Sequence, residues 1–495
     1  MSRLLKHIHD HTIAQPQAIA VVGPQDSVSY AELSEQVDAT ACWLRAHKVR
    51  ALGLHCSNSV DWIATDLAAV QLGIPIIPIP GFFTEQQVAH LITDSGIDAV
   101  LADDQQSYEF ETDRTAHISN QGLSLRRLPG SGTHENPKYA KVTYTSGSTG
   151  SPKGVCLSQA TIESVVEALS DRLIDTKMER HLCMLPFATL LENIAGVYLA
   201  LWNGASVIVD SPSEFGLLSN SEFSAQHFTA AVKQHQINSA ILLPQMLKAI
   251  VENSGLEKAG SGKAENNGLA SLSFLAVGGG KTPESVIAHA NCIGLPVFEG
   301  YGLSETASVL CINTPSHNRT GSVGQLLGHA KVHLAKDKEM IVSNPIMEGY
   351  LHDSETPENI ATGDIGHIDE DGYVYISGRK KNCLISGFGR NISPEWVESH
   401  LLGEAEISQI VVFGEAESHL SAVVVSALNY DCINLQTLIR KRNESLPDYA
   451  QIKKWVLADA PFKSENGLLT ANGKPKRDAI FAHYKQSLTE GAQLA

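Results

Sequence analysis

Apolar positions in the first half of the chain follow two alternating patterns. Apolar side chains recur at helical spacing over 29–48, 59–73 and 85–96, and short apolar runs with the length of buried strands lie at 50–58, 74–80 and 97–103. Gly73 closes the second helical segment, a position where glycine commonly ends a helix. Repeated alternation of strands and helices predicts a parallel α/β sheet.

The pattern changes after about residue 310. Residues 321–351 contain short alternating strands and turn residues, which predicts a small β-rich subdomain, and a turn-rich stretch follows over 362–382. Residues 383–495 have the pattern of a compact α/β module. We therefore expect an N-terminal domain over 1–380 and a C-terminal domain over 381–495, with the boundary near Lys381.

Composition narrows the functional classes. The 495 residues carry a net charge of −17 with no dense basic stripe, which argues against nucleic-acid binding. No apolar run is long enough to span a bilayer, and the first residues lack the apolar core of a secretion signal. The eight cysteines are scattered without a CxxC pair, so we expect neither disulfides nor zinc, and a reducing cytoplasm.

Residues 143–155, TYTSGSTGSPKGV, carry the strongest chemical signal. A strand-like segment precedes them and a helical one follows, so we expect the loop to join a strand to a helix. Glycines let backbone N–H groups approach an anion, and the hydroxyls and Lys153 add donors, so a phosphate is the expected ligand. The spacing G-x-x-G-x-x-K is not that of a Walker A loop. The alternative is a flexible surface loop with a solvated lysine.

This segment resembles the phosphate loop of the adenylate-forming superfamily, which includes acyl-CoA synthetases, carrier-protein adenylation domains and beetle luciferases. Three more segments resemble that superfamily's motifs in the same order: FEGYGLSETA (298–307), TGDIGHIDEDGYVYISGRKKN (362–382) and NGLLTANGKPKRDAI (466–480). The resemblance covers nearly the whole chain. It implies a large α/β domain of parallel-sheet subdomains with a small β-rich subdomain, followed by a small mobile α/β domain.

The resemblance also implies a set of site residues and ligands. It implies binding of ATP and Mg²⁺, and of CoA or the phosphopantetheine arm of a carrier protein. The implied nucleotide-binding residues are Thr145, Ser146, Gly147, Ser148, Thr149, Gly150, Lys153, Gly278, Gly279, Gly280, Glu299, Gly300, Tyr301, Gly302, Ser304, Asp364 and Arg379. Lys381 would be the hinge, and Gly387 and Gly389 would border the thiol tunnel.

Residue chemistry agrees with these roles. The ring of Tyr301 suits stacking on adenine, and the carboxylate of Asp364 suits the ribose hydroxyls. Glu305 would hold Mg²⁺ against the phosphates. Lys153, Glu305 and Lys474 form the implied catalytic set, with Lys474 stabilising charge at the α-phosphate.

Each of these residues also has a purely structural interpretation. Tyr301 could be a core residue, Glu305 a helix N-terminal acid and Asp364 a turn residue. Gly278, Gly279 and Gly280 could form a tight turn. Arg379 could belong to a solvated positive face, and so could Lys474, as we expect for its neighbours Lys476 and Arg477.

The segment CMLPFATLLENIAGVYLAL (183–201) bears on the acid that is activated. It is largely apolar and resembles the LPLxHxxE segment of fatty acyl-CoA synthetases, although Thr189 stands where histidine is usual and, further on, Phe388 stands where glycine is common. The leading prediction is a ligase that activates a fatty or aliphatic acid as acyl-AMP and transfers the acyl group to CoA. One alternative is a ligase that loads a carrier protein, and another is a nucleotide-binding regulatory protein without catalysis.

Overall fold

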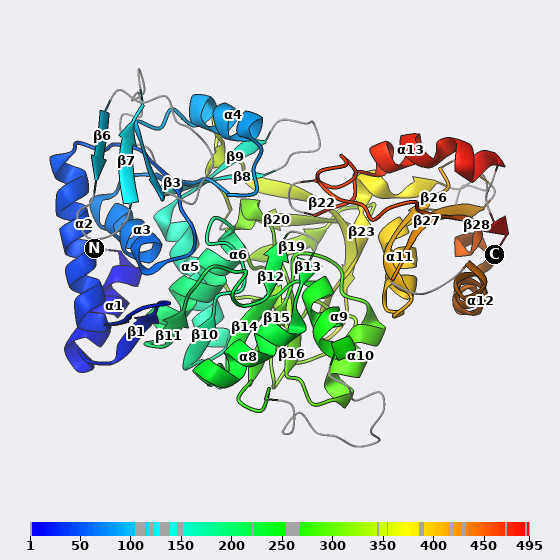
Figure 1. The fold of residues 1–495 in the computed structure, drawn as a ribbon, viewed down its shortest axis with the longest axis horizontal. Coiled ribbons are helices and arrows are strands. Elements are labelled where there is room, and N and C mark those ends of the chain that lie inside the picture. Colours follow the sequence, from blue (N-terminus) through cyan, green and yellow to red (C-terminus); the bar gives the residue numbers. More distant parts are fainter. Residues whose placement is uncertain are drawn as a thin grey trace.

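The structure is a computed structural model. It describes residues 2–103, 114–117, 123–128, 139–145, 152–219, 222–253, 268–343, 346–353, 355–385, 391–415, 417, 419–427, 432–470, 473–490 and 493–494. Figure 1 shows the large N-terminal part, in blue to green, extending to a smaller C-terminal part in orange and red. Two large sheets with parallel centres, a small antiparallel sheet and a C-terminal α/β unit confirm the predicted fold class.

One large sheet has a parallel centre with antiparallel strands at both edges. The neighbouring strands β14, β15 and β16 at its centre contribute residues to the cleft described below. In spatial order its strands are β18 (Gln325–Leu326), β17 (Cys311–Ile312), β16 (Val297–Tyr301), β15 (Phe274–Val277), β14 (Ser239–Leu242), β10 (Arg180–Leu182), β11 (Ser206–Ile208), β1 (Ile19–Val22) and β2 (Ser27–Ser29).

The second large sheet contains the strands that flank the phosphate-loop segment. Strands β8, β4, β3 and β5 are parallel, whereas β9 and β7 flank them in the antiparallel sense and the edge strands β21 and β6 pair antiparallel to β9 and β7. Its order is β21 (Gly349–Tyr350), β9 (Lys153–Leu157), β8 (Lys141–Thr145), β4 (Ile76–Pro78), β3 (Leu52–His55), β5 (Ala99–Asp103), β7 (Leu123–Arg127) and β6 (Arg114–His117).

Helices lie against these sheets, and the ends of α2, α3 and α4 follow local sequence signals. In α3, the Ser59 side chain accepts a hydrogen bond from the Trp62 N–H, and Gly73 ends the helix at φ 67°. The helices are α1 (Arg3–Ala14), α2 (Tyr30–Ala46), α3 (Val60–Leu72), α4 (Glu85–Ser95), α5 (Gln159–Arg172), α6 (Leu190–Glu192), the π-helical η1 (Asn193–Tyr198), α7 (Leu199–Trp202), α8 (Ala225–His235), α9 (Pro244–Asn253) and α10 (Glu284–Cys292).

The remaining elements form the small sheet, short turns and the C-terminal unit. The small antiparallel sheet is β19 (Lys331–Leu334), β20 (Glu339–Ser343), β22 (Asn359–Ile368) and β23 (Val374–Arg379), and the short pairs are β12 (Leu217–Ser219) with β13 (Glu222–Phe223) and β24 (Leu384–Ile385) with β25 (Asn391–Ile392). The C-terminal elements are α11 (Pro394–Leu402), β26 (Ile407–Phe413), β27 (Leu420–Ser426), α12 (Cys432–Asn443), β28 (Ile452–Leu457), α13 (Arg477–Glu490) and β29 (Gln493–Leu494). Single 3₁₀ turns are η4 (Ser304–Thr306), η5 (Lys380–Asn382) and η6 (Asp448–Ala450).

The segment after the phosphate loop differs from the expectation. We expected the loop to join a strand to a helix, but it joins two antiparallel strands, with Thr145 of β8 paired to Lys153 of β9. Helix α5 begins only after β9. Residues 154–157 are buried, and their hydrogen bonds to β8 satisfy backbone groups that would otherwise be unpaired. The prediction of a strand–loop–helix unit is therefore wrong.

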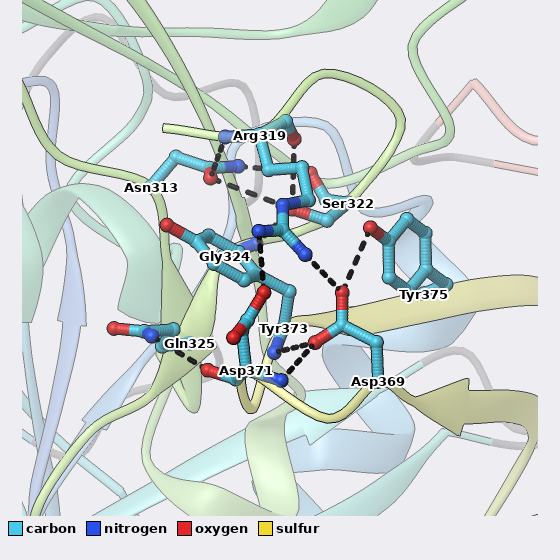
Figure 2. A network of polar contacts seen from close by, with 9 residues as sticks. All are labelled: Asn313, Arg319, Ser322, Gly324, Gln325, Asp369, Asp371, Tyr373 and Tyr375. Carbon is cyan, nitrogen blue, oxygen red and sulfur yellow. Dashed lines mark hydrogen bonds and ion pairs between the residues drawn. The ribbon is translucent and has the colours of Figure 1, made fainter. Parts of the chain in front are cut away.

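A network of polar contacts, shown in Figure 2, joins the small sheet to the large sheet that contains β17 and β18. Arg319, from the loop between β17 and β18, donates to Asp369 at 2.6 Å and to Asp371 at 2.8 Å in the turn between β22 and β23. The guanidinium lies 4.2 Å from the centre of the Tyr373 ring. Asn313 accepts from the Arg319 N–H at 3.0 Å. These contacts fix the hairpin that carries Asp364 relative to the strand that carries Tyr301.

Lys141, the first residue of β8, is buried in a polar cluster with side chains of α3 and η1. Its ammonium lies 2.9 Å from the Asp66 carboxylate of α3 and also contacts the Asn193 side-chain oxygen. The Tyr198 hydroxyl donates to the same carboxylate at 2.8 Å. Burial lowers the pKa of the Lys141 ammonium, and the charge of Asp66 opposes that shift.

We expect Lys141→Met to lower the free energy of unfolding by about 3–5 kcal/mol, because it leaves the Asp66 carboxylate buried without its cation. Urea denaturation followed by fluorescence would measure the loss. Lys177→Met, at an exposed position, is the control and should change stability by less than about 0.5 kcal/mol. A loss no larger than that of the control would contradict an energetic role for this pair.

The C-terminal unit contacts the large N-terminal part at several points. The Lys248 ammonium of α9 donates to the backbone oxygens of Glu404 at 2.8 Å and of Ile407 at 2.7 Å. The Ser393 hydroxyl, at the start of α11, donates to the Ser377 oxygen at 2.8 Å. The domain boundary near Lys381 and any rotation about it stay predictions.

Candidate active site

A cleft of about 3030 Å³ is lined by residues of the two large sheets, the small sheet and the C-terminal unit. Its lining includes every predicted site residue that the structure describes. These are Thr145, Lys153, Gly278, Gly279, Gly280, Glu299, Gly300, Tyr301, Gly302, Ser304, Glu305, Asp364, Arg379, Lys381 and Lys474. Segments more than 300 residues apart in sequence therefore meet around one cavity.

Lys153 and Glu305 both line the cleft, and both contact the side chain of Tyr350. Lys153 begins β9, and its ammonium lies 5.3 Å from the centre of the Tyr350 ring. The Tyr350 hydroxyl donates to the Glu305 carboxylate at 3.0 Å. Glu305 sits in the single turn η4, where the Met347 N–H donates to its backbone oxygen. A cation and a carboxylate are thus held by one aromatic side chain.

Asp364 has both carboxylate oxygens engaged. The Tyr301 hydroxyl donates to one at 2.6 Å, and the Arg379 Nε lies 2.8 Å from the other. Strands β22 and β23 place Asp364 and Arg379 opposite one another. Burial raises the pKa of the Asp364 carboxyl, and Arg379 and Tyr301 oppose the rise. A polyol bound at this carboxylate would donate hydrogen bonds from its hydroxyl groups to Asp364 in place of Tyr301 and Arg379.

Two glycines permit close approach of chain segments at the cleft. A Cβ on Gly302 would lie 1.5 Å from the Ser308 backbone oxygen, so no larger residue fits there. Gly279 adopts φ 81° in the turn after β15, a conformation that favours glycine. Ser308 itself has φ 98°, and its side-chain oxygen is buried without a hydrogen-bond partner among the described residues. Ser308 therefore holds an unfavourable backbone conformation beside the cleft.

Glu299 is an unusual acid in the middle of β16. Burial raises the pKa of its carboxyl to about 7, against the effects of Thr282 and Lys281. Burial also lowers the pKa of the Lys281 ammonium, which donates to the Ile376 oxygen at 3.3 Å. Both groups face the cleft. Perturbed groups of this kind concentrate at functional sites.

Lys474 reaches the cleft from the C-terminal unit. Its loop is closed by a hydrogen bond from the Thr470 N–H to the Lys474 oxygen at 2.8 Å. Lys474 is exposed to solvent and lines the cleft. Desolvation by the surrounding protein and the positive charge of Arg379 lower the pKa of its ammonium. The negative charges of Asp364 and Glu305 oppose this shift in the pKa of Lys474.

Part of the cleft lining, called the apolar branch below, consists largely of apolar residues of the sheet that contains β14 and β15 and of nearby helices. The sheet contributes Ile241, Phe274 and Ala276, and the facing helices contribute Leu169, Leu173, Leu191, Ala195 and Leu199. Most of these side chains are buried. Such walls suit an apolar acyl group.

Some predicted residues lie outside the described part of the chain, and the prediction for Arg477 is wrong. Ser146, Gly147, Ser148, Thr149, Gly150, Gly387, Gly389 and Phe388 lie outside the described residues. Arg477 is not solvated as expected: it makes two hydrogen bonds of 2.7 Å to the Glu398 carboxylate. Glu398 is buried, so its charge requires a nearby cation, and a charged stretch of sequence does not reveal that partner.

Sequence reasoning missed Tyr350, Lys281 and Lys248. Tyr350 follows a glycine in an otherwise ordinary segment, and its role depends on pairing with Val155 of β9 across the second sheet. A pairing between strands that lie far apart in the chain leaves no local periodicity to detect.

Two family comparisons identify the class of this protein. Residues 9–353 match the AMP-binding enzyme family, and residues 382–491 match the AMP-binding enzyme C-terminal domain. The chain belongs to the AMP-binding enzyme family. The predicted membership of the adenylate-forming superfamily, and hence of a class of enzymes, is confirmed.

Individual relatives are consistent with this class. The indoleacetate–CoA ligase of Aromatoleum aromaticum is 27% identical over 86% of this chain and 88% of its own. The long-chain-fatty-acid–CoA ligase FadD15 of Mycobacterium bovis is 24% identical over 92% and 91%. The o-succinylbenzoate CoA synthetase of Bacillus subtilis, in complex with its acyl-adenylate intermediate, shares the fold with a TM-score of 0.76 and 21% identity over 97% and 98%. The same enzyme has been solved with ATP and a magnesium ion.

The cleft residues fit the ligands of such an enzyme. Glu305 and Ser304 offer oxygen atoms of the kind that Mg²⁺ prefers. Asp364 offers a carboxylate to a ribose, and Tyr301 presents a ring beside it. No described helix is long and apolar enough to cross a membrane.

Proposed function

We propose that this protein is an ATP-dependent acid–thiol ligase. It would activate a carboxylic acid as acyl-AMP with release of pyrophosphate, and then transfer the acyl group to the thiol of CoA. The observation that carries the proposal is the convergence of Lys153, Glu305, Asp364 and Lys474 on one cleft. The CoA ligases among the relatives support the thiol as the acceptor.

The chemistry requires positive charge where two anions meet. A carboxylate oxygen attacks the α-phosphorus of ATP, the bond to the bridging oxygen breaks, and pyrophosphate leaves. Lys474 would stabilise negative charge between the carboxylate and the α-phosphate, and Lys153 would do so at the departing phosphates. Mg²⁺ bound at Glu305 would supply further charge neutralisation.

Positioning of the nucleotide would fall to the opposite side of the cleft. Tyr301 and the turn at Gly278, Gly279 and Gly280 would hold the adenine, and Asp364 with Arg379 would hold the ribose. In the second half-reaction the thiol attacks the acyl carbon and AMP leaves. Rotation about Lys381, with Gly387 and Gly389 bordering the thiol path, is proposed for that step.

The acid is proposed to be aliphatic, because the branch of the cleft beside Ile241 and Leu199 is largely apolar. The relatives include both a fatty-acid ligase and a ligase for an aromatic acid, so a panel of acids must contain both kinds. A carrier protein's phosphopantetheine arm is the alternative acceptor. A reducing compartment such as the cytoplasm would suit the free thiols among the described cysteines.

The test is pyrophosphate release by the purified full chain with ATP, Mg²⁺ and a panel of aliphatic and aromatic acids. We expect release with at least one acid, and thioester formation when CoA is added. Thioester formation with a carrier protein but not with CoA would favour the alternative acceptor. Nucleotide binding without pyrophosphate release from any acid would contradict the ligase and favour a regulatory protein.

A further inference from the structure

Three polar side chains form a relay at the wall of the apolar branch. The His181 Nε2 atom lies 2.9 Å from the Glu192 carboxylate, and its Nδ1 atom lies 3.1 Å from the Ser239 hydroxyl. All three residues are at most 1% exposed. His181 and Ser239 line the cleft. The roles proposed above for nucleotide, metal and leaving group use none of them.

The relay is closed on its helix side. A Cβ on Gly196 of η1 would lie 2.3 Å from the Glu192 oxygen and 2.7 Å from the His181 Nε2 atom, so the helix backbone covers both groups. The second Glu192 oxygen accepts the Leu185 N–H at 2.8 Å. The relay therefore meets the cleft through His181 and Ser239, and the Ser239 hydroxyl is its terminal group.

The hydrogen-bond inventory leaves capacity at Ser239. A serine hydroxyl has one donor and two acceptor positions, and the bond to His181 uses one of these. If His181 is neutral with its proton on Nε2, Ser239 donates to Nδ1 and can accept from a ligand. If His181 carries both protons, Ser239 accepts from Nδ1 and can donate to a ligand. A ligand hydroxyl suits both cases because it donates and accepts.

Cys183 belongs to the same buried group, since its sulfur, the His181 nitrogens and the Glu192 oxygens include atoms within 4.8 Å of one another. Both ring nitrogens of His181 already have hydrogen-bond partners. We therefore interpret the group as a hydrogen-bond relay that orients Ser239.

We propose that Ser239, oriented by His181 and Glu192, is a specificity residue that binds a hydroxyl group on the distal part of the acyl chain. The inference rests on the proposed ligase function and narrows its substrate to a hydroxylated, otherwise apolar acid. Desolvating a polar relay costs free energy, and a ligand hydroxyl that completes its hydrogen bonds offsets this cost.

The strand register indicates how far this hydroxyl lies from the reacting carboxylate. Ser239 is level with Phe274 across β14 and β15, and Phe274 precedes Gly278 by four residues. At ~3.3 Å per strand residue, Ser239 lies about 13 Å from the glycine turn proposed for the nucleotide. The hydroxyl should therefore be remote from the carboxylate.

The experiment compares three straight-chain saturated acids of one medium length in pyrophosphate release. One is unsubstituted, one has a hydroxyl at the far end, and one has a hydroxyl next to the carboxylate. For the wild type we expect kcat/KM for the far-end hydroxy acid to exceed that of the others by at least about tenfold. Ser239→Ala should remove this preference, so that its kcat/KM values for the far-end hydroxy acid and the unsubstituted acid agree within about threefold.

Ser273→Ala is the matched control. Ser273 lies beside β15 and donates to the Lys177 and Asn238 oxygens outside the cleft lining, so its loss should leave the preference intact. If Ser239→Ala does not fold, as judged by its thermal unfolding, Ser239→Cys offers a similar volume with a weak donor and should also lose the preference.

The outcomes separate the two proposals. Absence of a preference in the wild type, or its persistence in Ser239→Ala, would overturn the specificity role while the ligase remains. Failure of the wild type to release pyrophosphate with any acid would overturn the ligase itself.

Discussion

Lys474→Ala is expected to reduce acyl-adenylate formation by about 10²–10³-fold, because it removes a cation positioned for charge that develops in the transition state. Nucleotide binding should change little, since the groups proposed to hold adenine and ribose belong to the N-terminal part. Pyrophosphate release measures the first quantity, and calorimetric titration with AMP measures the second.

The same variant can be tested in the second half-reaction. Supplied with a preformed acyl-adenylate and CoA, it should form the thioester at close to the wild-type rate, because Lys474 is proposed to act only in adenylation. Lys476→Ala, which removes an exposed charge two residues away, serves as the control and should be active in both steps. Undiminished adenylation by Lys474→Ala would remove the catalytic assignment.

Glu305→Gln is expected to lower adenylation by roughly 10²-fold and to raise the Mg²⁺ concentration needed for half-maximal rate. Glutamine keeps an oxygen that can accept from Tyr350 but loses the charge that would hold the cation. Titration of Mg²⁺ at saturating ATP and acid measures both effects.

Tyr350→Phe separates the charge of Glu305 from its orientation. It removes the hydroxyl that bonds Glu305 but keeps the ring beside Lys153 and leaves the carboxylate intact. We expect a loss of only about tenfold, with a Mg²⁺ requirement close to wild type. Equal losses in both variants, without a change in Mg²⁺ dependence, would argue against a metal site at Glu305.

Local sequence signals predicted many of the elements that carry the site. Periodicity located α2, α3 and α4 to within a few residues, and Gly73 marked the end of α3, because helix ends depend on residues that lie at the ends themselves. The motif residues Tyr301, Glu305 and Asp364 were also identifiable, because each motif groups residues whose chemistry suits a nucleotide.

Contacts between distant segments were not predictable in the same way. The approach of Tyr350 to Lys153 and Glu305 depends on strand pairing between β21 and β9. The burial of Arg477 against Glu398 depends on how α13 meets α11. In a list of residues, a buried ion pair and a solvated charge look alike, because the difference is the water excluded by neighbours from elsewhere in the chain.

The sequence by itself determined the class of chemistry, because hydroxyls, glycines, a lysine and carboxylates in ordered motifs suit a triphosphate and its metal. Tertiary structure decided which of those groups share a cavity, and it joined His181, Glu192 and Ser239 into one relay. The physical reason is that the sequence specifies each side chain's functional group. The local dielectric environment, the distances between groups and their hydrogen-bond partners are set only when separate strands and helices pack together.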